Sequence, residues 1–165
     1  MAGFALKFDR KSTELFKKLG DKKLLRLNKA FKDVGDDFRK TAGAIFENTA
    51  GNLRFWKDLK PNTKKRKLEK FGFVYPTLFN TGVLRDTFSE ISDSENVEVI
   101  KDKIATFGSA SDIATYHQEG RGNLPKREII NKGWVDKNKK RWIQRIEKEL
   151  VKLWTQAGIH VRRTL

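Results

Sequence analysis

Apolar residues recur every three or four positions between Asp21 and Thr49. They are Leu24, Leu27, Phe31, Val34, Phe38, Ala42 and Ile45. This spacing predicts one stripe of a long helix, with Asp21 as a candidate N-cap and Gly51 as a candidate stop. The stripe fits either a coiled-coil seam or a face packed on the chain's own core. Leu25 and Phe46 broaden it, which favours packing within the molecule.

Two glycines are expected to weaken this first helix, and a shorter helix is predicted before it. Gly35 and Gly43 fall inside it, and each is expected to weaken the helix by about 1 kcal/mol relative to alanine. The preceding stretch, from Ser12 to Leu19, predicts a shorter helix capped by Ser12.

Two further helices follow from the same kind of pattern. Pro61 stands where a basic helix reaching Lys70 can begin, because proline is tolerated in the first helical turn. The last helix is predicted from Trp134 to Ala157. Its apolar face comprises Trp142, Ile146, Leu150, Leu153 and Ala157.

The middle of the chain has a sequence pattern typical of short β-strands. Three short β-leaning runs, at 87–91, 97–100 and 104–107, predict a small antiparallel meander. A short helix is expected to open at Ser111 and to end at Gly120, followed by a loop at 121–125. The predicted fold class is therefore α+β, with long N-terminal and C-terminal helices packed together over one face of a small antiparallel β-sheet.

Composition narrows the class of protein. The 165 residues are 38% hydrophobic and include 12 Phe and 4 Trp, which predicts a single folded domain over residues 1–165. There is no cysteine, so disulfides and thiolate metal sites are excluded and an assembly in the cytosol is expected. No apolar run approaches the roughly 18 residues of a membrane span, and we expect neither a secretory signal nor contact with a membrane.

The net charge of +15 is unevenly distributed. Residues 1–50, 51–70 and 126–165 carry +5, +6 and +8, whereas residues 71–125 carry −4. This reversal suggests two faces with different partners, nucleic acid or an acidic protein on one and basic surfaces on the other. Simple solubility is the alternative interpretation.

Residues for catalysis or metal binding do not form a recognisable pattern. Two histidines, His117 and His160, cannot build a histidine-rich zinc site, and no cofactor is expected. Ser109, Ser111, Asp112 and His117 are close in sequence, but no nucleophile turn accompanies them. The sequence therefore predicts a protein that is not an enzyme.

Two basic clusters are candidate DNA-facing or interface residues. They are Lys64, Lys65, Arg66 and Lys67, and Lys139, Lys140 and Arg141. Either could neutralise phosphates without sequence preference, or could be a solvated helix face. A non-specific nucleic-acid-binding protein, with tryptophan and phenylalanine as stacking platforms, is thus an alternative function. Trp142 and Trp154 lie on the apolar stripe of the last helix, which favours the core for them.

Four short stretches, in a fixed order, carry a resemblance to a known family. They are Trp56-x-x-Leu59-x-Pro61-x-Thr63; Leu78-x-x-Thr81-Gly82-x-Leu84-Arg85; Phe107-Gly108-Ser109 with His117-Gln118-x-Gly120; and Leu124-Pro125-Lys126-Arg127. In this order the stretches resemble the phage virion morphogenesis family, the tail-completion and neck proteins of Mu-like phages.

The resemblance implies a structural virion protein. Such a protein would form a homo-oligomeric ring, with a hexamer as the expectation, at the head-tail junction or the tail end, and would complete the tail so that it joins the head. Its partners would be its own copies, the neighbouring head-tail connector and tail proteins, and genomic DNA in the lumen without sequence preference. It would be located in the virion, and in the host cytoplasm during assembly.

Within the motif, the residue types indicate structural roles. Trp56 and Leu59 are expected to anchor the core, and Gly82 and Gly120 to adopt unusual backbone geometry. Arg127 is expected to form an ion pair or to bond a carbonyl. The remaining motif residues are Pro61, Thr81, Leu84, His117 and Pro125.

Overall fold

A computed structural model of the chain describes residues 2–7, 21–47, 56–101 and 104–156. The elements are β1 (Ala2–Lys7), α2 (Asp21–Glu47), α3 (Pro61–Phe71), α4 (Val83–Ser89), β2 (Asn96–Lys101), β3 (Ile104–Ser109), α5 (Asp112–Glu119) and α6 (Lys132–Gln156). The predicted α+β class is confirmed.

The sheet has three antiparallel strands in the order β1-β3-β2. β3 lies in the centre, where Phe4 is opposite Phe107 on one side and Glu98 is opposite Phe107 on the other. Ala105 and Phe107 are buried, so this strand supplies the sheet's contribution to the core. The sequence prediction missed β1, whose partner lies about a hundred residues further along the chain.

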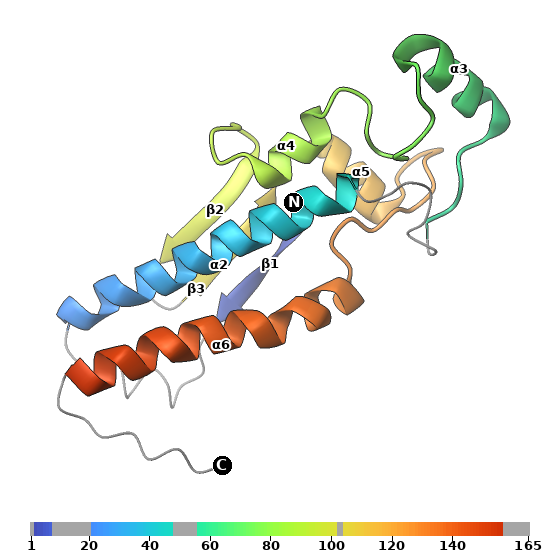
Figure 1. Ribbon diagram of the computed structural model, residues 1–165. Helices are drawn as coiled ribbons and strands as arrows, with labels where there is room; N and C mark the ends of the chain where they lie inside the picture. The colour runs from blue at the N-terminus through green and yellow to red at the C-terminus, as the bar shows by residue number, and fades with distance from the viewer. Residues whose placement is uncertain (1, 8–20, 48–55, 102–103, 157–165) are drawn as a thin grey trace.

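The two long helices run side by side in front of the sheet (Figure 1). The apolar stripe of α2 is buried, so the expectation of intramolecular packing is confirmed over the described residues. Phe38 is central to this packing. Its ring lies 5.9 Å from that of Phe107 in the sheet and 5.8 Å from that of Trp134 at the start of α6.

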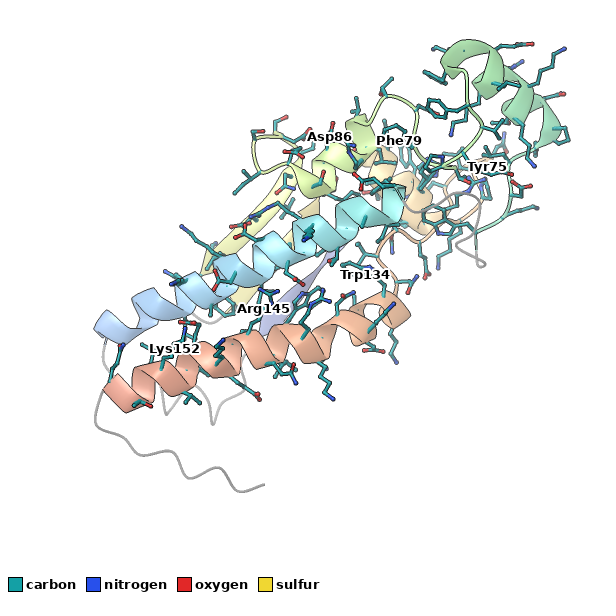
Figure 2. The ribbon with its side chains drawn as sticks, viewed as in Figure 1. Tyr75, Phe79, Asp86, Trp134, Arg145 and Lys152 are labelled. Atoms are coloured by element: carbon teal, nitrogen blue, oxygen red, sulfur yellow. The ribbon has the colours of Figure 1, made fainter. Side chains whose placement is uncertain are left out.

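Asp37 joins α2 to α6 through polar contacts. Its carboxylate accepts hydrogen bonds from the indole Nε1 of Trp142 at 2.8 Å and from the guanidinium groups of Arg141 and Arg145 at 2.6 and 2.8 Å. In Figure 2, Trp134 and Arg145 mark the side of α6 that faces α2. A carboxylate with three such donors holds the helix pair in one register.

One of the three predicted strands is wrong. Residues 83–89 form α4 instead of a strand at 87–91. Thr87 and Phe88 are adjacent and both fully buried, which a strand exposed on one face would not allow because it alternates its side chains. The hydroxyl of Ser109 bonds that of Thr87 at 2.9 Å, and Phe88 packs 5.9 Å from Phe46.

The other boundaries agree with the predictions where the chain is described. The strands at 97–100 and 104–107, the helix from Pro61, the helix ending at Gly120 and the C-terminal helix are all present. The expected helix at 12–19 and the stop at Gly51 lie outside the described residues. None of the helices in the described ranges has the length and apolar composition needed to cross a membrane.

Candidate functional site

A cleft of about 780 Å³ separates α3 from the start of α4, from α5 and from the loop that follows α5. α3 extends away from the two long helices, and the loops on either side of it lead back to the body of the protein (Figure 1). Seven of the ten residues chosen from the motif line this cleft. They are Leu59, Thr81, Gly82, Leu84, His117, Pro125 and Arg127.

Arg127 is a buried residue of one cleft wall and bonds two separate backbone segments. Its side chain is 4% exposed, and its Nη2 and Nε atoms donate to the carbonyl oxygen of Lys57 at 3.0 and 3.3 Å. Its backbone N–H donates to the carbonyl of His117 at 2.7 Å. The expectation of a carbonyl-bonding residue is confirmed. Burial lowers the pKa of Arg127, although nearby Asp58 acts in the opposite direction.

Two other side chains tie the same segments together. The indole Nε1 of Trp56 donates to the carbonyl of Glu128 at 3.1 Å, and its ring packs partly buried against the core, as expected. Gln118 donates to the carbonyl of Ile130 at 2.8 Å and accepts from the N–H of Ile129 at 2.9 Å. Gln118 was not among the predicted site residues, although it stands inside the third motif stretch. Leu59 lines the cleft instead of joining the fully buried core.

The two motif glycines have the unusual backbone geometry that was expected. Gly82 precedes α4 with φ of 90°, and Gly120 follows α5 with φ of 73°. A Cβ atom at Gly120 would lie 2.9 Å from the backbone nitrogen of Lys126. The absence of a side chain therefore lets the loop fold back onto the end of α5.

Lys67 differs from its prediction as a DNA-facing residue. It is 6% exposed, and its ammonium donates to the carbonyls of Pro76 and Thr77 and lies 5.4 Å from the ring of Phe73. Burial lowers its pKa. This lysine fastens α3 to the segment after it and is not available to phosphate.

The other three residues of that cluster lie in different environments. Lys64 pairs with Asp58 at 2.6 Å, and Asp58 also accepts from the hydroxyl of Tyr75 at 2.8 Å. These bonds lower the pKa of Asp58 to about 2 and raise that of Lys64. Lys65 is exposed, 4.0 Å from Glu69, and Arg66 is exposed at the cleft.

The second basic cluster is also divided. Lys139 and Lys140 are exposed on α6, whereas Arg141 is bound to Asp37. Trp142, which directly follows Arg141 in sequence, is completely buried. It therefore offers no face on which a base could stack.

His117 is a half-buried residue of the cleft lining. Its Nδ1 atom is buried and has no hydrogen-bond partner among the described residues. Burial, followed by the nearby charge of Arg127, lowers the pKa of His117. The serine considered with it at the sequence level, Ser109, is buried and bonds Thr87. In the described ranges, no three His, Cys, Asp or Glu side chains gather as a metal site would require.

The cleft combines an apolar interior with a cationic rim. Val83, Ile113 and Leu124 line it while remaining 58%, 53% and 42% exposed. Its rim cations are Lys57, Lys60, Arg66 and Lys70, and none of these forms an ion pair with another described residue. The acid in the lining, Asp58, is already paired with Lys64. Such a surface fits an apolar segment that carries carboxylates.

Comparisons with known proteins add no relative. A scan of the sequence against models of protein families finds no match, and searches of curated proteins and of solved structures likewise find none. The resemblance to the virion morphogenesis family therefore depends on the four motif stretches alone.

Proposed function

We propose that this protein is a structural virion subunit of a tailed phage, which forms a ring at the head-tail junction or the tail end and so completes the tail for joining to the head. One observation carries the proposal. Seven of the ten motif residues, drawn from all four stretches, line one open cleft, and Arg127, Gln118 and the two glycines hold backbone segments in place there. The motif thus specifies the shape of a surface, as an assembly protein requires.

The mechanism is burial of complementary surfaces between subunits. A closed ring of identical chains needs two different patches that match each other. The positive cleft and the acidic segment at 90–95 supply patches of opposite charge, which favours association of like subunits. Hexameric symmetry is the expected ring size, and the neighbouring connector and tail proteins are the expected further partners, in the virion after assembly in the host cytoplasm.

Purified protein and phage particles together test this function. Light scattering and electron microscopy should find a ring of the free chain or a ring within particles. A chain that stays monomeric and is missing from particles would refute the proposal.

Non-specific nucleic-acid binding remains the second candidate function, because Lys139, Lys140 and the cations of the cleft rim are exposed. Burial of Trp142 weighs against it, since base stacking needs an exposed ring. In a ring, the exposed lysines of α6 are candidates to face DNA in the lumen.

A further inference from the structure

We propose that the cleft receives the turn at residues 90–95 of a second copy of this chain. This inference depends on the proposed ring and names the contact that builds it. The turn is Glu90-Ile91-Ser92-Asp93-Ser94-Glu95, between α4 and β2.

The turn presents one apolar side chain among carboxylates. Ile91 is 65% exposed, and Glu90 and Glu95, the first and last residues of the turn, are also exposed. Neither glutamate nor Asp93 forms an ion pair with another described residue. Burying the side chain of Ile91 on docking would be favourable, and a cationic surface would complement the carboxylates of the turn.

The turn is also held in one conformation. The N–H of Asp93 bonds the carbonyl of Glu90 at 3.1 Å, and the N–H of Asn96 bonds the carbonyl of Asp93 at 3.0 Å. The carboxylate of Asp93 accepts from the N–H of Glu95 at 2.8 Å, and the carbonyl of Glu95 accepts from Ala110 at 2.7 Å. A turn that is ordered before binding loses little conformational entropy on docking.

The cleft has the complementary features. Its exposed apolar residues, Val83, Ile113 and Leu124, can cover Ile91, and the unpaired cations at the rim can meet the two glutamates. The volume of about 780 Å³ accommodates a turn of several residues and exceeds what one side chain would fill.

The positions of turn and cleft lead to a ring. α4 begins at the cleft with Gly82 and ends at the turn with Glu90, so the two surfaces lie at opposite ends of one helix (Figure 1). Because Ala110, just after β3, bonds the turn at Glu95 and so fixes it at this end of α4, a chain cannot place its own turn in its own cleft. Each copy would insert its turn into the next, which is a head-to-tail interface of the kind that forms a ring when the rotation between copies closes.

Cysteine cross-linking tests this contact directly, because the chain contains no cysteine of its own. Full-length Ile91→Cys is mixed with a differently tagged Leu124→Cys and oxidised mildly. The expected heterodimer forms at least about tenfold more than in a mixture of Ile91→Cys with Ile143→Cys, a matched control on α6 that is 38% exposed. Equal yields in the two mixtures would overturn the proposal.

Charge reversal supplies a second readout. Glu90→Lys with Glu95→Lys in the Ile91→Cys protein, or Lys60→Glu with Arg66→Glu in the Leu124→Cys protein, should each reduce cross-linking about tenfold, because like charges then meet. Combining the two reversed proteins should restore it. Failure of this restoration, with both proteins folded, would contradict the contact.

Particles separate the failure of this contact from the failure of the proposed function. The double variant Ile91→Cys/Leu124→Cys, incorporated into particles and oxidised, should give covalent multiples of the chain. A ring that is present without such multiples overturns the docking contact and leaves the ring intact, as does a cross-link from Leu124→Cys to a different virion protein. A chain that is monomeric and absent from particles overturns both.

Discussion

Gly35 lies where α2 packs against β2 and β3. A Cβ atom there would be 2.7 Å from Cε1 of Phe107 and 2.9 Å from Oε2 of Glu98. At the sequence level this glycine is expected to weaken the helix, and that local cost is outweighed by the close approach it permits.

Gly35→Ala should therefore destabilise the protein despite the better helix propensity of alanine. We expect the free energy of unfolding in urea to fall by about 1–3 kcal/mol, as for overpacked cores. Gly133→Ala is the control, because Gly133 is an exposed helical glycine whose added Cβ would meet its nearest neighbour at an ordinary 3.4 Å. A stabilised Gly35→Ala protein would contradict the packing described for α2.

His117 should make stability depend on pH. Its pKa is lowered in the folded state from the ordinary value of 6.5, so the unfolded chain binds more protons between the two values. Its contribution to stability is complete above about pH 6.5 and is lost as the pH falls from there through the folded pKa. Between about pH 7.5 and 5, the urea midpoint of the wild type should therefore fall further than that of His117→Gln, which lacks the titrating imidazole. Parallel curves at all pH values would show that His117 does not titrate as described.

At the scale of elements, α3 is connected to the body of the protein through few fixed points. Lys67 is one of them, because its ammonium donates to the carbonyls of Pro76 and Thr77. α3 forms one wall of the cleft, so the position of this helix determines the shape of the proposed interface.

Lys67→Met should loosen α3, since it removes the donor and leaves those carbonyls without their partner. Hydrogen exchange of the α3 amides should become about 10–100 times faster, corresponding to about 1–3 kcal/mol. Lys65→Met is the matched control on the same helix, because the side chain of Lys65 is 79% exposed. Equal hydrogen-exchange rates of the α3 amides in the two variants would show that Lys67 does not hold α3 in place.

The elements also show what sequence can predict. The stripe of α2 and the face of α6 are periodic over many turns, so local pattern sufficed for both helices. The strand predicted at 87–91 overlaps the end of α4 (Val83–Ser89). It was predicted because Thr87 and Phe88 have β propensity, and the bond of Thr87 to Ser109, 22 residues further along the chain, is not visible in the local pattern. β1 was missed for a similar reason, since pairing with β3 is a long-range event.

The candidate site was predictable in part. The roles of Gly82, Gly120 and Arg127 were predictable from residue type. Glycine adopts a positive φ without steric strain, and the guanidinium of arginine donates readily to backbone carbonyls. It was not predictable which residues of the two basic clusters are buried or paired and which are exposed. Lys67 and Arg141 have their partners fixed by tertiary structure, so identical charges in one run have different functions.

At the scale of the whole molecule, positive charge is what the two candidate functions share. Replacing the exposed cations tests whether this charge binds DNA. The variant keeps Lys67 and Arg141, which have structural roles, and carries Lys65→Gln, Arg66→Gln, Lys139→Gln and Lys140→Gln. For a virion protein, we expect weak duplex binding, with Kd of about 10⁻⁴ to 10⁻⁶ M at physiological salt and without sequence preference. The slope of log K against log salt should fall by about 0.9 for each phosphate contact removed. Tight, sequence-selective binding in gel shifts would instead favour the nucleic-acid function.

The most direct test of the structural function is electron microscopy of particles from a phage whose copy of this coding region has been deleted. The account predicts heads and tails that fail to join, and infectious particles containing a ring of this chain when the wild-type protein is supplied in trans. Normal infectious particles assembled in its complete absence would contradict the account.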